Sequence, residues 1–208
     1  MSRQRIAQEA PGTDLRLDDF PAVDLAVDRR LVRVHGAGHG PGWFSSDKGG
    51  RFDLTAPRGT SYAGDALAVA LREALGGLAR QGRVPVAEAR LRAASIVVGV
   101  AGRFAAVSVP EAARFGVTSE LTSMPMYTVP QMWAEAFAAA GFDGIRYTAR
   151  FTPGPANSWA VFGPAGAHPL GRVVEAIPGI EACRLAGLHV LADIPASSAL
   201  TTLPPPTP

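Results

Sequence analysis

The stretch from Leu31 to Leu75 constrains the fold more than any other part of the chain, because a strand, a long loop and a helix follow one another there. β-Branched residues over 31–34 predict a strand in which Arg33 points to the face opposite its two valine neighbours. Glycine is frequent between Gly36 and Gly50, and a long loop in a compact domain is often functional. We interpret the rest of the chain as the support for this stretch.

A short strand over 61–63 and a helix that begins near Leu67 complete the stretch. Apolar side chains recur on one face of this helix, at Leu67, Leu71, Ala74, Leu75 and Leu78, which indicates the side that packs against a core. Glu73 lies at the edge of that face among small residues. Such surroundings leave space for a ligand, although an ordinary glutamate at the boundary of a core would have the same neighbours.

The later part of the chain contains further predicted strands and helices. Strands are expected over 95–100, 104–107, 143–148 and 158–162, and a strand–helix–strand unit over 172–193. Thr128 and Gln131 have the spacing of a capping box, so the Thr128 hydroxyl is predicted to cap a helix that stops at Gly141. The proline-rich segment from Pro195 onward is expected to be a disordered tail.

The composition favours one globular domain and excludes several classes of protein. With 208 residues, of which 47% are hydrophobic and 18% charged, the chain can build a sizeable core. A net charge of +2 without a basic run is too small to indicate direct nucleic-acid binding. Cys183 is the only cysteine, so no intrachain disulfide can form, and we expect a buried thiol in a reducing compartment.

Signals for membranes, metals and the common nucleotide motifs are missing from the sequence. The first residues have no apolar signal core, and no stretch reaches the roughly 18 consecutive apolar residues of a membrane helix. We therefore expect a cytoplasmic protein without membrane contact. The four histidines share no zinc-like spacing, which predicts no metal site. The glycine-rich segments match neither a phosphate loop nor a dinucleotide fingerprint, and there is no GxSxG elbow.

Five side chains have the chemistry to hold and act on a phosphorylated nucleoside. Arg33 and Arg51 can form paired hydrogen bonds to phosphate and keep their charge when partly buried. Tyr62 can stack on a planar ring with its hydroxyl free, and Glu73 can hold a ribose hydroxyl or stabilise positive charge at C1 of the sugar. Thr128, at a helix N-terminus, lies where an anion is favoured. Each residue taken alone also has an ordinary structural explanation.

Taken together, these residues resemble the RES-domain family, the toxin half of bacterial Xre–RES toxin–antitoxin pairs, which is named for an arginine, a glutamate and a serine. The order and spacing of several short motifs carry the resemblance, which spans about residues 28–165. The motifs are the Arg33 strand, Gly49-Gly50-Arg51-Phe52, Tyr62-Ala63, Ala70-Leu71-Arg72-Glu73, Tyr127-Thr128-Val129-Pro130-Gln131, Gly144-Ile145-Arg146-Tyr147 and Trp159-Ala160-Val161-Phe162.

The resemblance implies a single α+β domain, in which helices flank the split mixed β core of the ADP-ribosyltransferases around an NAD cleft. Family members degrade NAD by hydrolysis or phosphorolysis of the nicotinamide–ribose bond, and some are described as ADP-ribosylating a protein. NAD would be the substrate here, without a metal. Arg33 would hold the NAD phosphates with help from Arg51, and Tyr62 would pack on the nicotinamide or its ribose. Glu73 would place the ribose and stabilise the developing positive charge.

Two positions depart from the family pattern. The family serine aligns with Thr128, which would then be the third catalytic residue, or in a second alignment with the region of Thr148 and Ala149. The turn after Arg51 reads Phe52-Asp53, where the family usually has tryptophan and asparagine. An altered or lost activity therefore stays open.

The resemblance thus implies an NAD-degrading toxin that a Xre-type helix-turn-helix antitoxin neutralises. A protein ADP-ribosyltransferase and an inactive domain that only binds NAD or the antitoxin are the alternatives, and a homodimer stays open. The expected layout is an N-terminal arm over 1–27, the NAD-binding domain over 28–165, an extension of that domain over 166–194 and a tail over 195–208.

Overall fold

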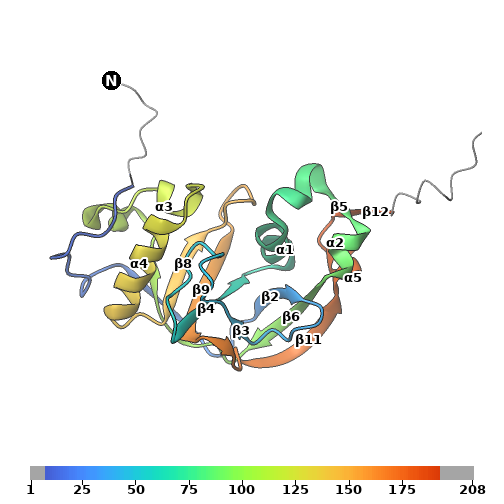
Figure 1. Cartoon of the computed structure of the whole chain (residues 1–208), viewed down its shortest axis with the longest axis horizontal. Coiled ribbons are helices and arrows are strands. Elements are labelled where there is room, and N and C mark those ends of the chain that lie inside the picture. Colours follow the sequence, from blue (N-terminus) through green and yellow to red (C-terminus); the bar gives the residue numbers. More distant parts are fainter. Residues whose placement is uncertain (1–7, 193–208) are drawn as a thin grey trace, which may run out of the picture.

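The computed structural model describes residues 8–192, which form one α+β domain built on a large mixed sheet (Figure 1). Helices α3 (Glu120–Ser123) and α4 (Thr128–Ala139) lie at one end of the sheet, and α1 (Leu67–Leu75), α2 (Val86–Arg90) and α5 (Gly179–Leu185) lie at the other. Two 3-10 helices, η1 (Gly76–Gly82) and η2 (Pro110–Phe115), complete the helical part. The single α+β domain with a mixed sheet, as the family resemblance implies, is confirmed.

The large sheet has eight strands in the order β1, β7, β8, β9, β4, β2, β6 and β11. Their bounds are β1 (Ala22–Leu25), β2 (Leu31–Gly36), β4 (Arg58–Gly64), β6 (Arg92–Val98), β7 (Gly102–Ala106), β8 (Gly144–Thr148), β9 (Asn157–Pro164) and β11 (Arg172–Pro178). β7 and β8 are parallel, and the other neighbours are antiparallel. Two short sheets pair β3 (Trp43–Phe44) with β10 (Gly166–Ala167) and β5 (Arg83–Pro85) with β12 (His189–Leu191).

The large sheet is almost divided between β4 and β2. β4 pairs with β9, and β2 pairs with β6, along their whole lengths, whereas only Val32 and Gly64 are in register between β2 and β4. Backbone groups released at such a division need other hydrogen-bond partners. One of them, the Tyr62 carbonyl, accepts a hydrogen bond from Arg33 Nη1 at 3.0 Å. The division is the split of the β core, and it places Arg33 at its opening.

Each half of the sheet has an apolar cluster of its own, and a third cluster crosses the split, with Leu31 on one side and Ala63 and Trp159 on the other. On one side, α4 buries Trp133 and Phe137 together with Phe142. On the other side, α1 and α5 bury Leu71 and Cys183 in a second cluster, as expected for the lone thiol. Because burial of large apolar side chains is the main stabilising contribution in such domains, each half holds its own edge of the split in place.

The predicted elements of the 31–75 stretch are confirmed as β2, the central part of β4 and α1. The predicted capping box of α4 is wrong. Tyr127 occupies the N-cap position without a side-chain cap, and Thr128 is exposed. Gln131 Nε2 instead donates to the carbonyls of Lys48 and Gly50, at 3.0 and 2.9 Å, because the loop before β4 lies against this helix. The predicted tail over 195–208 lies outside the described residues.

Candidate active site

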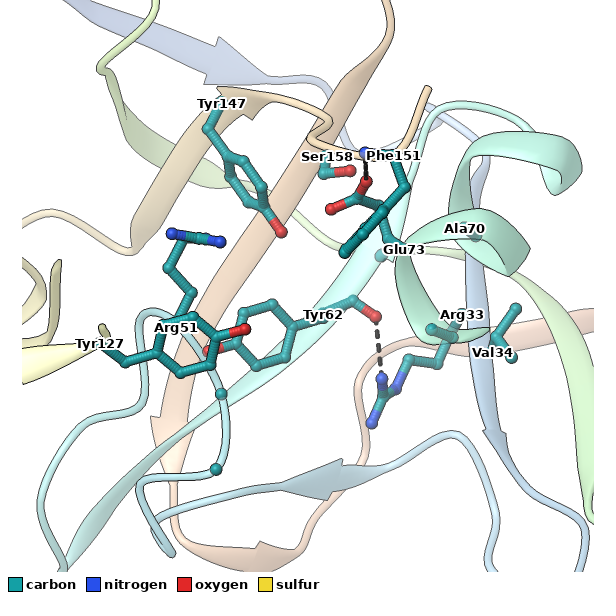
Figure 2. Close-up of a pocket in the computed structure, with 14 residues that line it drawn as sticks. Arg33, Val34, Arg51, Tyr62, Ala70, Glu73, Tyr127, Tyr147, Phe151 and Ser158 are labelled. Carbon is teal, nitrogen blue, oxygen red and sulfur yellow. Dashed lines mark hydrogen bonds between the residues drawn. The ribbon is translucent and has the colours of Figure 1, made fainter. Parts of the chain in front are cut away.

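A pocket of about 230 Å³ opens at the split between β4 and β2. Four of the five predicted site residues line it, namely Arg33, Arg51, Tyr62 and Glu73. Figure 2 shows that Arg33 and Arg51 lie on opposite sides of the Tyr62 ring, and that the Glu73 carboxylate faces the hydroxyls of Tyr147 and Ser158. The pocket is smaller than the roughly 300–1,000 Å³ of typical small-molecule sites, so it can enclose one end of a dinucleotide rather than all of it.

Arg33 extends from the middle of β2 into the split. In addition to its bond to Tyr62, it donates through Nη2 to the Trp43 carbonyl at 3.5 Å, while Nε is buried without a hydrogen-bond partner. Burial lowers the pKa of Arg33 to about 10, although the charge of Asp53 opposes this effect. The guanidinium therefore stays protonated at neutral pH, and its unpartnered Nε is suited to an anionic ligand.

Arg51 forms the opposite wall and is 8% exposed. Its Nη1 donates to the Met124 carbonyl at 2.7 Å, and its guanidinium lies 4.8 Å from the centroid of the Tyr127 ring. Burial lowers the pKa of Arg51, and the nearby positive charge of Arg150 adds to this effect. These contacts fix the cation against an aromatic ring, an arrangement that suits planar recognition of phosphate or carboxylate groups.

Tyr62 lies between the two arginines on β4. Its hydroxyl donates to Asp53 Oδ1 at 2.8 Å and accepts from the Phe52 amide at 2.8 Å. The Tyr62 hydroxyl, predicted to be free to bond, thus bonds to protein groups rather than being left for a ligand, because the turn after Arg51 folds back onto this strand. The ring still lines the pocket, so stacking on a planar ligand remains a prediction.

Glu73 projects from the last turns of α1 into the pocket. Its Oε1 accepts a hydrogen bond from the Phe151 amide at 2.6 Å, which joins the helix to the loop between β8 and β9 (Figure 2). Burial raises the pKa of Glu73, while the Phe151 amide and the charges of Arg51 and Arg150 favour its ionised form. A half-buried carboxylate among small residues and cations is suited to stabilise a positive charge that develops on a bound sugar.

Thr128 is absent from the lining of this pocket, whereas the hydroxyl-bearing Ser158 lines it. Ser158 begins the buried part of β9, and its Oγ makes no hydrogen bond of good geometry within the described residues. Burial raises the pKa of the adjacent Tyr147, and the charge of Glu73 adds to this, so its hydroxyl remains a neutral donor. Sequence reasoning missed both residues as site candidates. The signals that could have found them were the motif over 144–147 and a serine at the start of a strongly apolar strand.

Within residues 8–192, no group of three or more histidine, cysteine, aspartate or glutamate side chains is placed to hold a metal ion. No described helix combines the length and the apolar character needed to cross a membrane. The pocket itself is lined by two arginines, one carboxylate, hydroxyl groups and aromatic rings. Such a set can bind an anionic nucleotide and stabilise a cationic sugar.

Comparison with known proteins agrees with the motifs. A family model of the RES domain matches residues 7–178. Among solved structures, a chain of the crystal structure of the M. tuberculosis MbcT–MbcA toxin–antitoxin complex has a similar fold, with a TM-score of 0.59. The two chains are 14% identical, and the similarity covers 76% of this chain and 88% of that one. No curated protein sequence matches the chain.

Proposed function

The chain belongs to the RES-domain family, and from this membership we propose that it is an NAD-degrading toxin that cleaves the bond between nicotinamide and ribose. The observation that carries the proposal is that Arg33, Arg51 and Glu73 line one pocket together with aromatic side chains. The similarity in fold to a chain of a toxin–antitoxin complex supports the toxin role. Fold alone does not determine function, so the proposal depends on the side chains of the site.

The proposed reaction begins with NAD bound by its nicotinamide riboside end. Arg33 holds the phosphates at the opening of the split, and Tyr62 packs against the nicotinamide or its ribose. The C1–nitrogen bond breaks with its electron pair going to nicotinamide, which leaves as a neutral molecule. Ionised Glu73 stabilises the cationic sugar that remains, and this selective stabilisation of the transition state lowers the barrier.

We assign the hydroxyl of the site to Ser158 rather than Thr128. Ser158 lines the same pocket as Glu73, whereas Thr128 is exposed beside it at the start of α4. The Ser158 hydroxyl lies next to the Tyr147 hydroxyl but makes no hydrogen bond of good geometry, so it can donate to a ribose oxygen at little cost. Thr128 keeps no proposed catalytic role.

The acceptor for the sugar is water or inorganic phosphate in the proposed reaction. An oxygen of the acceptor bonds to C1, and its proton passes to solvent. Arg150 is exposed, and its charge reaches Arg51 and Glu73 in the pocket. Paired cations favour an incoming phosphate over water, so dependence on phosphate is the informative measurement.

We further propose that the toxin acts in the cytoplasm and that an antitoxin of the Xre helix-turn-helix type neutralises it, without direct contact of the toxin with nucleic acid. Expression of the chain alone is expected to stop bacterial growth, and coexpression with its cognate antitoxin is expected to restore growth. A homodimer is compatible with this scheme and can be measured by light scattering.

The test is the release of free nicotinamide from NAD by the purified protein, with and without phosphate. We expect release by the wild type and a loss of at least about a hundredfold in Arg33→Ala and Glu73→Ala, because each removes a charge that acts in the transition state. Arg72→Ala is a matched control, since Arg72 neighbours Glu73 on α1 but does not line the pocket.

Absence of nicotinamide release from folded wild-type protein under both conditions would refute NAD degradation. Radiolabel transferred from NAD to a protein would instead favour the ADP-ribosyltransferase alternative. Growth arrest that survives Glu73→Ala would favour a domain that acts by binding alone.

A further inference from the structure

Asp53 is a fully buried carboxylate that lies behind the pocket without lining it. Its Oδ1 accepts from the Tyr62 hydroxyl at 2.8 Å, and its Oδ2 accepts from the Gly50 amide at 2.8 Å and the Ser45 hydroxyl at 2.9 Å. A buried carboxylate is costly unless such donors surround it, so this arrangement favours the ionised form. The side chain thus ties β4 to the loop that precedes it.

Tyr62 connects the two cationic walls of the site. Its carbonyl accepts from Arg33, and at the far end of the side chain its hydroxyl contacts both Asp53 and the Phe52 amide. The Phe52 amide directly follows Arg51, so the phenol ring spans the distance from Arg33 to the turn that carries Arg51. Figure 2 shows the ring in this position.

The packing around Gly50 shows how closely these groups are held. A Cβ atom built at Gly50 would lie 2.3 Å from Asp53 Oδ1 and 2.5 Å from the Tyr62 hydroxyl. Neither group can move away without breaking its hydrogen bonds, so only glycine fits here. The turn, the carboxylate and the phenol therefore form one rigid unit.

We propose that Asp53 is a positioning residue that acts through the Tyr62 hydroxyl to fix the separation of Arg33 and Arg51, and so the placement of a bound dinucleotide. This inference rests on the proposed function, because it assumes that both arginines contact the substrate. A displacement of about 1 Å between groups that hold a substrate can reduce the rate about a hundredfold.

Electrostatics support the same role. Arg33 makes no ion pair with a carboxylate of the described residues. The negative charge of Asp53 is nevertheless among those that raise the pKa of Arg33. Burial raises the pKa of Asp53, while hydrogen bonds from Gly50, Tyr62 and Ser45 counteract this effect. Asp53 thus supplies a counter-charge to Arg33 from behind the ring, which leaves the pocket side of the guanidinium available for an anion.

The test is a double-mutant cycle on Asp53 and Tyr62. In Asp53→Asn an amide NH2 group replaces one carboxylate oxygen. The side chain can then no longer accept hydrogen bonds at both ends, from Tyr62 at one and from Gly50 and Ser45 at the other. Tyr62→Phe keeps the ring but removes the hydroxyl. We expect each single variant to raise KM for NAD, and to weaken binding of an uncleavable NAD analogue, about tenfold. The double variant is expected to match Tyr62→Phe within about twofold.

Equal KM in Asp53→Asn and wild type, or effects that multiply to about a hundredfold in the double variant, would overturn the inference. If the role of Asp53 were purely structural, Asp53→Asn would lower the melting temperature but leave the KM of the folded protein unchanged, so both quantities are measured. Asp143→Asn is the matched control, because Asp143 also accepts a backbone hydrogen bond but lies away from the pocket. If wild type neither binds nor cleaves NAD, the proposed function fails, which is a separate outcome from these.

Discussion

Glu73 shows how one residue combines two opposing influences. Burial disfavours its charge, whereas the amide of Phe151 and two nearby arginines favour it. The result is a carboxylate that ionises at a higher pH than usual but carries its charge where a cationic sugar would lie. It is also the only carboxylate among the residues that line the described pocket. Its protonation state therefore determines the electrostatics of the proposed reaction.

The pH dependence of NAD cleavage is expected to follow this residue. The pKa of Glu73 is raised, so the carboxylate takes up its proton at a pH above the ordinary glutamate pKa of about 4.3. Activity that depends on its charge is therefore lost as the pH falls through this raised value. The measurement is kcat/KM between pH 4 and pH 8, a range of about four units chosen to span this pKa. Glu111→Gln, a change on η2 outside the pocket lining, should keep the wild-type profile. An unchanged acid limb in Glu73→Gln would contradict the assignment.

At the scale of elements, local pattern predicts what each segment forms better than what it contacts. The alternation in β2 placed Arg33, and the helical face of α1 placed Glu73 at its boundary. Ser158 and Tyr147 could not be found in this way, because they enter the site only through the order in which β8 and β9 join β4. The hydrogen bond between Tyr62 and Asp53 likewise depends on a turn that only the folded chain forms.

The start of α4 illustrates the same limit. Thr128 and Gln131 match a capping box in spacing, yet tertiary contacts use the glutamine to hold the loop at Lys48 and Gly50. A local motif predicts a hydrogen bond only when no distant partner competes for the same side chain. Here the competing partner is the turn that carries Arg51, so α4 helps to position the pocket wall.

Substitutions of Thr128 and Gln131 test whether the two residues form a capping box or whether Gln131 instead holds the loop at Gly50. Thr128→Ala is expected to change the free energy of unfolding by less than about 0.5 kcal/mol, since the exposed hydroxyl caps nothing, whereas a true cap contributes about 1 kcal/mol. Gln131→Ala is expected to raise KM for NAD several-fold, because it frees the Gly50 turn. Urea unfolding and steady-state kinetics measure the two effects. A large loss of stability in Thr128→Ala would restore the capping box.

The whole molecule consists of two half-sheets, each with an apolar cluster of its own, and a third cluster crosses the split where strand pairing is weakest. Arg33 and Glu73 approach the pocket from the half that contains β2 and α1, while Arg51 is held by the segment before α4. A ligand that contacts all three would connect the two halves. Binding energy would then add to the contacts of the third cluster, which already joins the two halves.

An uncleavable NAD analogue should therefore stabilise the folded chain. At a concentration about 100 times its Kd, a ligand that binds only the folded state raises the free energy of unfolding by about 2.7 kcal/mol. Chemical denaturation with and without the analogue measures this gain. Arg30→Ala, which removes an exposed ion pair with Glu175 outside the pocket lining, should retain it, whereas Arg33→Ala should lose it at the same analogue concentration. Equal stabilisation of both variants would mean that the ligand binds elsewhere, and the split between β4 and β2 would lose its role as the substrate site.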